Sequence, residues 1–177
     1  FGRLDIMVAN AGILGPETPL HETDTGDFDE VFDVNVRGLF YDCRAAVRAM
    51  LEGNGGSIVT VGSILSVAAD PMLTSYTATK AAVLGLTKAI AVDYAARDIR
   101  CNCVLPGDME TPMIEEYFAA TGDPAAAREE MERTYPIKRL AQPREVAQAI
   151  RFLASPESSY VTGTHLLVDG GLVAKAY

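Results

Sequence analysis

The stretch SIVTVGSILSVAADPMLTSYTATKAAVLGLTKAIAVDYAARDIRCNCVLPG, residues 57–107, decides the fold class. Its two short apolar runs, residues 57–61 and 99–105, predict buried strands that end at Gly62 and at Pro106. The longer segment between them, residues 74–96, predicts a helix. A strand, a helix and a second strand in this order predict a β-α-β unit, in which the two strands lie parallel.

The flanking sequence continues this alternation. Residues 4–9 are apolar almost throughout, as in a strand that is covered on both faces, and residues 166–168 predict a last short strand. Residues 25–51 carry apolar side chains at steps of three and four, which predicts one long helix that the glycines of residues 53–56 stop. Residues 143–153 predict another helix. The chain is therefore expected to form a single α/β domain with a parallel sheet of about four strands.

The segment between the last two predicted strands includes a polar, alanine-rich excursion, residues 111–136. We expect Asp123 to cap a short helix there, with Pro124 in its first turn. Several larger apolar residues within and next to the excursion suggest a partly apolar pocket: Met109, Met113, Ile114, Tyr117, Phe118 and Met131.

Composition excludes several classes of function. The chain has 24 acidic and 15 basic residues, a formal net charge of −9, and such a surface repels nucleic acid and anionic membranes. No membrane-spanning run or signal peptide is found. Cys43, Cys101 and Cys103 are expected to be reduced thiols in the cytoplasm. The two histidines lie far apart and Cys101 and Cys103 lack zinc spacing, so no metal site is expected.

Tyr76 and Lys80 are the most informative pair for chemistry. At positions i and i+4 of a helix they share one face, where the Lys80 ammonium is expected to favour the phenolate and lower the pKa of Tyr76. A tyrosine tuned in this way can exchange a proton with an alcohol or a carbonyl. Taken alone the pair is weak evidence, because an ordinary surface pair has the same spacing.

Two further residues strengthen the interpretation of Tyr76 and Lys80 as a proton-transfer pair. Ser63 follows the predicted strand of residues 57–61, and ligands of parallel sheets bind beyond the carboxyl ends of the strands, where a hydroxyl can polarise a carbonyl. Its alternative role is that of a turn residue. Asn35, followed closely by Gly38, is a poor choice inside a helix, which hints at a site. The alternative is a helix kink capped by Asn35.

Six motifs occur in one order: Asn10-Ala11-Gly12, Asn35, Ser63, Tyr76-Thr77-Ala78-Thr79-Lys80, Pro106-Gly107-Asp108-Met109-Glu110-Thr111 and Val168-Asp169-Gly170-Gly171. Together they resemble the short-chain dehydrogenase/reductase family in its single-domain form. The resemblance implies a Rossmann-like doubly wound parallel sheet, of which residues 1–177 are the C-terminal portion, with residues 108–136 as a substrate-binding lid. It also implies an NAD(P)-dependent oxidoreductase that interconverts a secondary alcohol and a ketone.

The resemblance assigns a role to each catalytic residue. Tyr76 would be the general acid in reduction and the general base in oxidation. Lys80 would lower the pKa of Tyr76 and hydrogen-bond the nicotinamide ribose. Ser63 would orient the substrate carbonyl, and Asn35 would hold a water that links Lys80 to solvent.

It further implies the contacts of a cofactor, NAD or NADP without distinction. The residues expected along it, besides Tyr76 and Lys80, are Asn10, Ala11, Gly12, Pro106, Gly107, Met109 and Thr111. The family's assemblies imply a homodimer or homotetramer formed through the helices of residues 25–51 and 74–96.

Two features depart from the family pattern. Asp108 stands where a bulky apolar residue is usual; its carboxylate either steers substrate choice or points to solvent, and we favour the second. No glycine-rich pyrophosphate motif occurs, so residues 4–9 would form a bare apolar sheet edge. We expect that an upstream segment exists which this sequence does not represent. The alternatives are a fragment that cannot bind cofactor and a non-catalytic protein that keeps the fold.

Overall fold

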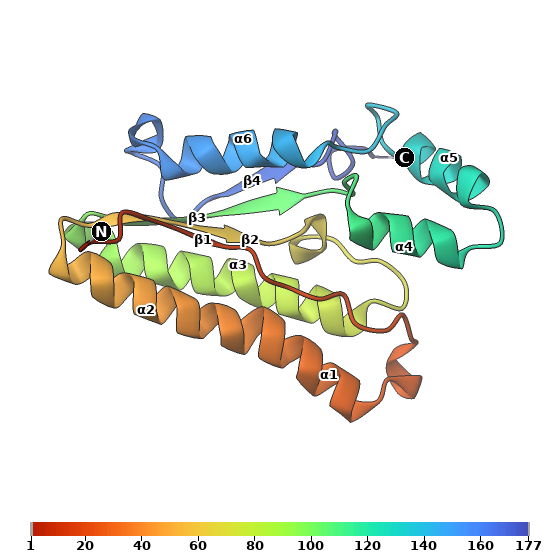
Figure 1. Ribbon diagram of the computed structural model, residues 1–177, viewed down its shortest axis with the longest axis horizontal. Helices are drawn as coiled ribbons and strands as arrows, with labels where there is room; N and C mark the ends of the chain where they lie inside the picture. The colour runs from red at the N-terminus through yellow and green to blue at the C-terminus, as the bar shows by residue number, and fades with distance from the viewer. Residues whose placement is uncertain (1, 177) are drawn as a thin grey trace.

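A computed structural model, which describes residues 2–176, contains one parallel sheet of four strands in the order β1-β2-β3-β4 (Figure 1). The strands are β1 (Ile6–Ala9), β2 (Gly56–Val61), β3 (Ile99–Pro106) and β4 (His165–Val168). Spatial order equals sequence order, so every connection crosses back over the sheet to the next strand. This confirms the expected α/β class and parallel arrangement.

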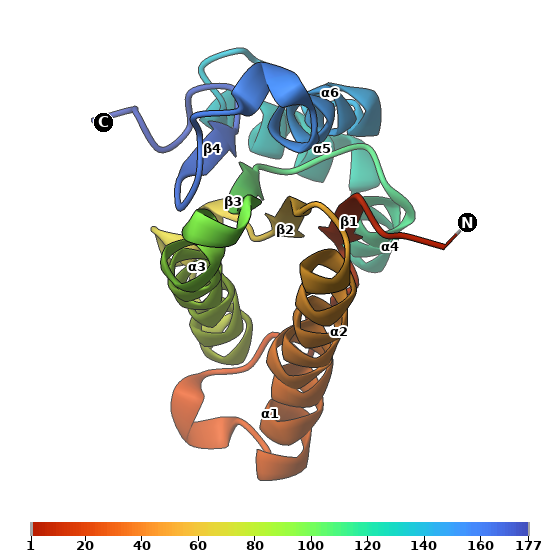
Figure 2. The same ribbon diagram turned by 90° about the vertical axis from the view of Figure 1, so that its left-hand side faces the viewer.

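Helices cover both faces of the sheet (Figure 2). Helices α1 (Thr25–Phe32), α2 (Leu39–Glu52) and α3 (Thr74–Tyr94) lie on one side, and α6 (Pro143–Ala154) lies on the other. Helices α4 (Pro112–Ala120) and α5 (Pro124–Thr134) lie beyond the carboxyl ends of the strands (Figure 1). The sheet is therefore the middle layer of three, and its carboxyl edge is the place where helices and loops meet.

Alternation along the strands separates two cores. Ile58 of β2 packs against α2 and α3, in a cluster that includes Met50 and Val83, whereas the next residue, Val59, packs with Val146 on the α6 side. All of these side chains are buried. Successive side chains of a strand point to opposite faces, so a continuous apolar run is what a sheet covered on both sides requires.

The single helix expected over residues 25–51 differs in one detail. Between α1 and α2 the chain forms a π-helical segment, Asp33–Gly38, with Asn35 buried inside it. A π-helical turn inserts one residue per turn and is found mostly at functional sites. The hint drawn from the poor helix formers in this segment therefore coincides with a real irregularity, which apolar spacing alone did not reveal.

Two local expectations, the cap of Asp123 and the start of a helix at Pro143, are confirmed. The Asp123 carboxylate accepts a hydrogen bond from the backbone N–H of Ala126 at the start of α5. Pro143 begins α6, and all three cysteines are buried and unpaired. No helix among residues 2–176 is long and apolar enough to cross a membrane.

Strand β1 lies at the edge of the sheet, and within residues 2–176 it pairs with β2 alone. Ile6 is 50% exposed and Val8 is 39% exposed, so the apolar run that was interpreted as a covered strand has uncovered side chains here. An exposed apolar edge strand favours pairing with another polypeptide segment.

Arg100 ties β3 to the carboxyl end of α6. Its guanidinium donates hydrogen bonds to the carbonyl oxygens of Leu153 at 2.9 Å and Ser155 at 3.0 Å, and to the Ser158 hydroxyl at 2.9 Å. These carbonyl groups end a helix and have no partner within it.

We expect Arg100→Met to lower the free energy of unfolding by about 2 kcal/mol, because the hydrogen bonds that its charged guanidinium donates to the end of α6 are lost. Arg97→Met is the matched control, since Arg97 is exposed and forms no side-chain hydrogen bond within residues 2–176. Urea unfolding of both variants measures the difference. Equal stabilities would show that Arg100 does not hold α6.

Candidate active site

Residues from four segments meet at the carboxyl edge of the sheet. Gly12 follows β1, Ser63 follows β2, and Gly107 follows β3, while Tyr76 and Lys80 lie in the first two turns of α3. Parallel pairing brings the carboxyl ends of all strands to one side, and ligands of open α/β sheets bind there. The fold thus gathers residues that are far apart in the sequence.

Lys80 is buried, with 5% of its surface exposed. Its Nζ lies 5.4 Å from the centre of the Tyr76 ring and donates a hydrogen bond to the Val61 carbonyl oxygen at 3.2 Å. The Thr79 hydroxyl donates to the Tyr76 carbonyl oxygen at 2.7 Å. The predicted shared face of Tyr76 and Lys80 is therefore confirmed, and the end of β2 fixes the lysine.

Asn35 joins three segments. Its Oδ1 accepts from the Ile13 N–H at 2.8 Å, and its Nδ2 donates to the Ile13 carbonyl oxygen at 2.8 Å and to the Thr79 hydroxyl at 3.1 Å. The side chain thus clamps the loop after β1 to α3. The water-holding role expected for Asn35 stays a prediction; the clamp was not foreseen, because its partner Ile13 lies 22 residues away.

Gly12 lies beside this clamp. A Cβ at position 12 would lie 3.2 Å from the Asn35 Oδ1 and 3.3 Å from the Lys80 Nζ, closer than side chains normally approach. Gly12, Asn35 and Lys80 therefore meet at one point. Asn10 and Ala11, which precede Gly12, are exposed at the end of β1.

Ser63 has the turn role that was considered as its alternative, and its role toward a substrate carbonyl stays a prediction. Its hydroxyl accepts from the Leu65 N–H at 3.2 Å and so starts the short turn Ile64–Ser66. The Ser66 hydroxyl donates to the Lys80 carbonyl oxygen at 2.8 Å, which fixes this turn against α3. The turn places Ser63 next to Tyr76, close enough to lower the pKa of Tyr76 through a side-chain hydrogen bond.

The expected direction of the Tyr76 pKa is wrong for this structure. Burial raises the pKa of Tyr76, the hydrogen bond with Ser63 lowers it, and the charge of Asp108 raises it again. Burial also lowers the pKa of Lys80. Desolvation disfavours the charged form of either group. The i, i+4 spacing indicates proximity, but it contains no information on burial, which dominates here.

Asp108 does not point to solvent as we had favoured. It is half-buried, and its Oδ2 accepts a hydrogen bond at 2.7 Å from the hydroxyl of Tyr135, which in turn accepts from the Asp108 N–H at 2.8 Å. Burial raises the pKa of Asp108, Tyr135 lowers it, and the charge of Asp70 raises it. The sequence did not reveal Tyr135 as a partner, because 27 residues separate the two.

The remaining residues of the motif after β3 lead into α4. Pro106 is buried at the end of β3, Met109 pairs with Ala141, and the Thr111 hydroxyl donates to the Met109 carbonyl oxygen at 3.3 Å. Thr111 also forms the N-terminal cap position of α4. These residues thus run along the carboxyl edge of the sheet, and their contacts with a cofactor stay a prediction.

Arg128 of α5, which sequence reasoning missed, binds this segment to the two helices. Its guanidinium pairs with Glu110 at 2.6 Å and with Glu115 of α4 at 2.6 Å. The hydrogen bond from Arg128 lowers the pKa of Glu110. The guanidinium also lies 5.0 Å from the centre of the Phe118 ring, which is buried. One arginine therefore connects α4, α5 and the loop after β3.

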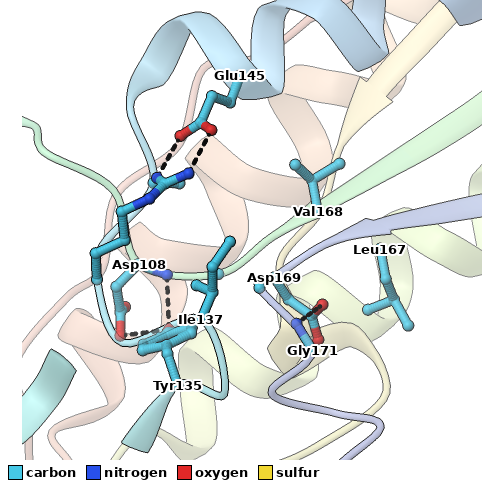
Figure 3. Close-up of a pocket in the computed structure, with 12 residues that line it drawn as sticks. Asp108, Tyr135, Ile137, Glu145, Leu167, Val168, Asp169 and Gly171 are labelled. Atoms are coloured by element: carbon cyan, nitrogen blue, oxygen red, sulfur yellow. Dashed lines mark hydrogen bonds and ion pairs between the residues drawn. The ribbon is translucent and has the colours of Figure 1, made fainter. Parts of the chain in front are cut away.

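Two hollows flank the gathered residues. A groove of about 530 Å³ separates the loop after β1 from α4, and is lined by Ile13, Leu14, Glu17, Met113, Glu116, Tyr117, Ala120 and Thr121. A cavity of about 330 Å³ lies behind Asp108 and Tyr135, next to the end of β4 (Figure 3). Within residues 2–176, no group of three or more His, Cys, Asp or Glu side chains is arranged to hold a metal ion.

Comparison with known proteins decides the family. A family profile described as "Enoyl-(Acyl carrier protein) reductase" matches residues 1–173. Cis-4-hydroxycyclohexanecarboxylate dehydrogenase of Sinomonas cyclohexanicum is 45% identical over 174 residues, covering 98% of this chain and 68% of that protein. The chain belongs to the short-chain dehydrogenase/reductase family.

Solved structures of other family members share the fold. Levodione reductase superposes with a TM-score of 0.95 at 35% identity, over 100% of this chain and 69% of that one. ElxO with NADP bound superposes with a TM-score of 0.92 at 33% identity, over 99% of this chain and 69% of that one. NAD⁺-bound xylitol dehydrogenase superposes with a TM-score of 0.89 at 30% identity, over 96% of this chain and 69% of that one. This short-chain dehydrogenase/reductase chain thus spans about two thirds of the proteins it matches.

Two substitutions should move the pKa of Tyr76 in opposite directions. Ser63→Ala is expected to raise it, because the Ser63 hydrogen bond that lowers it is lost, and Asp108→Asn is expected to lower it, because a negative charge that disfavours the phenolate is removed. Nuclear magnetic resonance titration of carbon-labelled tyrosines, with Tyr76→Phe to assign the resonance, measures both. A shift of the same sign in both variants would contradict the electrostatics described here.

Proposed function

We propose that the protein interconverts a secondary alcohol and a ketone, with NAD or NADP as the hydride carrier and Tyr76 as the general acid and base. The observation that carries the proposal is the convergence of Ser63, Tyr76 and the buried Lys80 at the carboxyl edge of the sheet. The dehydrogenases and reductases among its relatives support the reaction class. Unpaired buried cysteines fit a cytoplasmic protein.

The residues present fit a nicotinamide cofactor. Gly12 leaves its backbone open beside Lys80, since a Cβ there would meet both Asn35 and the Lys80 Nζ. The residues proposed to hold the cofactor are Asn10, Ala11, Gly12, Tyr76, Lys80, Pro106, Gly107, Met109 and Thr111. When bound, the nicotinamide supplies or accepts the hydride. ElxO and xylitol dehydrogenase carry NADP and NAD⁺ respectively, so the relatives support either nucleotide.

The chain's own residues move the proton. In oxidation the Tyr76 oxygen takes the proton of the substrate hydroxyl, and in reduction it returns a proton to the carbonyl oxygen. Ser63 donates a hydrogen bond to the same substrate oxygen and stabilises negative charge that develops on it. Lys80, whose Nζ lies 5.4 Å from the centre of the Tyr76 ring, would hydrogen-bond the ribose of the nicotinamide nucleotide. We also propose that Asn35, fixed by its clamp on Ile13, holds the water that connects Lys80 with solvent.

Residues 108–136 are proposed to form the substrate-binding lid. Helices α4 and α5 lie at the carboxyl edge of the sheet, and the groove of about 530 Å³ runs between α4 and the loop after β1. Its wall combines apolar side chains such as Met113 and Tyr117 with the carboxylates of Glu17 and Glu116. Such a groove fits a small alcohol or ketone.

A second candidate is a non-catalytic protein that has the family's fold but binds no cofactor. Calorimetric titration with NAD and NADP distinguishes the candidates, because only the proposed enzyme binds a nucleotide.

Tyr76→Phe is expected to reduce turnover by at least about 100-fold, because general acid–base catalysis typically contributes this much or more. Nucleotide affinity should stay nearly unchanged, since the ring and the Lys80 contact remain. Steady-state kinetics of the full-length protein with a ketone panel, together with calorimetry, measure both quantities. Activity within tenfold of the parent would remove Tyr76 from the proposed role.

We also propose a homodimer or homotetramer formed through helices of residues 25–51 and 74–96. Large apolar side chains on these helices are exposed, among them Val92 at 81% and Tyr41 at 52%. Light scattering of the full-length protein should show a dimer or tetramer, and Val92→Glu should weaken it, because a charge would enter an apolar contact. A monomeric parent protein would contradict the proposal.

A further inference from the structure

Asp108 is a half-buried carboxylate beside the proposed reaction centre. It follows Gly107 at the carboxyl end of β3, and its charge acts on Tyr76. Its side chain also lines the cavity of about 330 Å³ shown in Figure 3. Strands β2 and β3 are paired neighbours, so Asp108 after β3 and Ser63 after β2 lie at adjacent strand ends, on the edge where ligands of open α/β sheets bind.

The carboxylate is held in place by a dedicated partner. Tyr135 is only 2% exposed, and its hydroxyl bonds both the backbone and the side chain of Asp108 (Figure 3). Gly107 makes this approach possible, since a Cβ there would lie 3.0 Å from the Tyr135 ring. Asp108 is therefore fixed by a buried residue, which is what a recognition group requires.

One oxygen of this carboxylate stays available. Tyr135 occupies Oδ2, and within the described part of the chain no donor is bonded to Oδ1 and no cation pairs with Asp108. The arginine that lines the same cavity, Arg139, is engaged by Glu145 through two hydrogen bonds of 2.7 and 2.8 Å (Figure 3). A carboxylate offers about four acceptor positions, so Asp108 can take a further donor.

We propose that Asp108 determines substrate specificity by accepting a hydrogen bond from a second hydroxyl group of the substrate, so that the enzyme prefers neutral polyols. This inference rests on the proposed function. An anionic substrate would be repelled by Asp108 and by Asp70, whose charge acts on it. A cationic substrate would approach the ammonium of Lys80, which lies beside Tyr76. A neutral hydroxyl avoids both repulsions.

The test compares substrates that share one ring: cyclohexanol, a cyclohexanediol, an aminocyclohexanol and a hydroxycyclohexanecarboxylate. We expect kcat/KM of the full-length protein to be at least about tenfold higher for the diol than for cyclohexanol, the effect of one hydrogen bond to a charged group. Asp108→Leu should remove this advantage, measured as the ratio of kcat/KM for the diol to kcat/KM for cyclohexanol in the same variant, so that any effect on Tyr76 that both substrates share cancels. Glu157→Gln, an exposed carboxylate far along the chain, is the matched control and should change neither value.

Two outcomes of these measurements overturn the inference. A diol advantage that persists in Asp108→Leu, or a parent enzyme that prefers the amine or the carboxylate, would exclude Asp108 as a hydroxyl acceptor. If Asp108→Leu does not fold, Asp108→Asn, which keeps an acceptor for Tyr135 but removes the charge, should lower the diol advantage several-fold. Absence of turnover with every substrate and both nucleotides would instead contradict the proposed function. In that case calorimetry still compares the binding of the diol and of cyclohexanol to the parent protein and to the Asp108 variant. A parent protein that binds the diol and cyclohexanol with equal affinity would overturn the role of Asp108.

Discussion

Burial of the Lys80 ammonium is the constraint on which the arrangement of the site depends. A buried charge is costly unless polar groups surround it, and here the Val61 carbonyl oxygen at the end of β2 accepts a hydrogen bond from it. The loop after β1 passes so close to the ammonium that a Cβ at position 12 would lie 3.3 Å from the Lys80 Nζ, which explains the glycine there. This loop must in turn be fixed in position. Asn35 holds that loop through two hydrogen bonds to Ile13. The π-helical segment, the loop after β1 and the first turns of α3 thus act together to keep one cation in place.

Different contacts hold the two parts of the site, which are the residues around Tyr76 and the segment of α4 and α5. Ser63 starts the turn that follows β2, and Tyr76 and Lys80 lie in α3. Hydrogen bonds fix this turn and the end of β2 to α3. The segment that supplies the walls of the groove is attached differently, through the ion pairs of Arg128 with Glu110 and Glu115. The groove walls and the residues around Tyr76 are therefore held by separate sets of contacts.

Much of the fold, and the proximity of Tyr76 to Lys80, follow from the sequence, because both depend on local patterns. Continuous apolar runs such as residues 57–61 indicate strands covered on both sides, and Tyr76 and Lys80 share a face by helix geometry alone. The errors concern what the tertiary structure adds. The pKa of Tyr76 rises because of burial, and Asp108 is directed inward by a tyrosine 27 residues away. Neither burial nor a distant partner can be inferred from spacing along the chain.

A crystal structure of the full-length protein with an oxidised nicotinamide nucleotide and an alcohol inhibitor tests the central claim most directly. The account predicts that the alcohol oxygen lies within about 2.6–3.2 Å of both the Tyr76 hydroxyl and the Ser63 hydroxyl, as proton transfer requires. An alcohol bound elsewhere, or oriented with its oxygen away from Tyr76, would contradict the assignment of Tyr76 as the group that moves the proton.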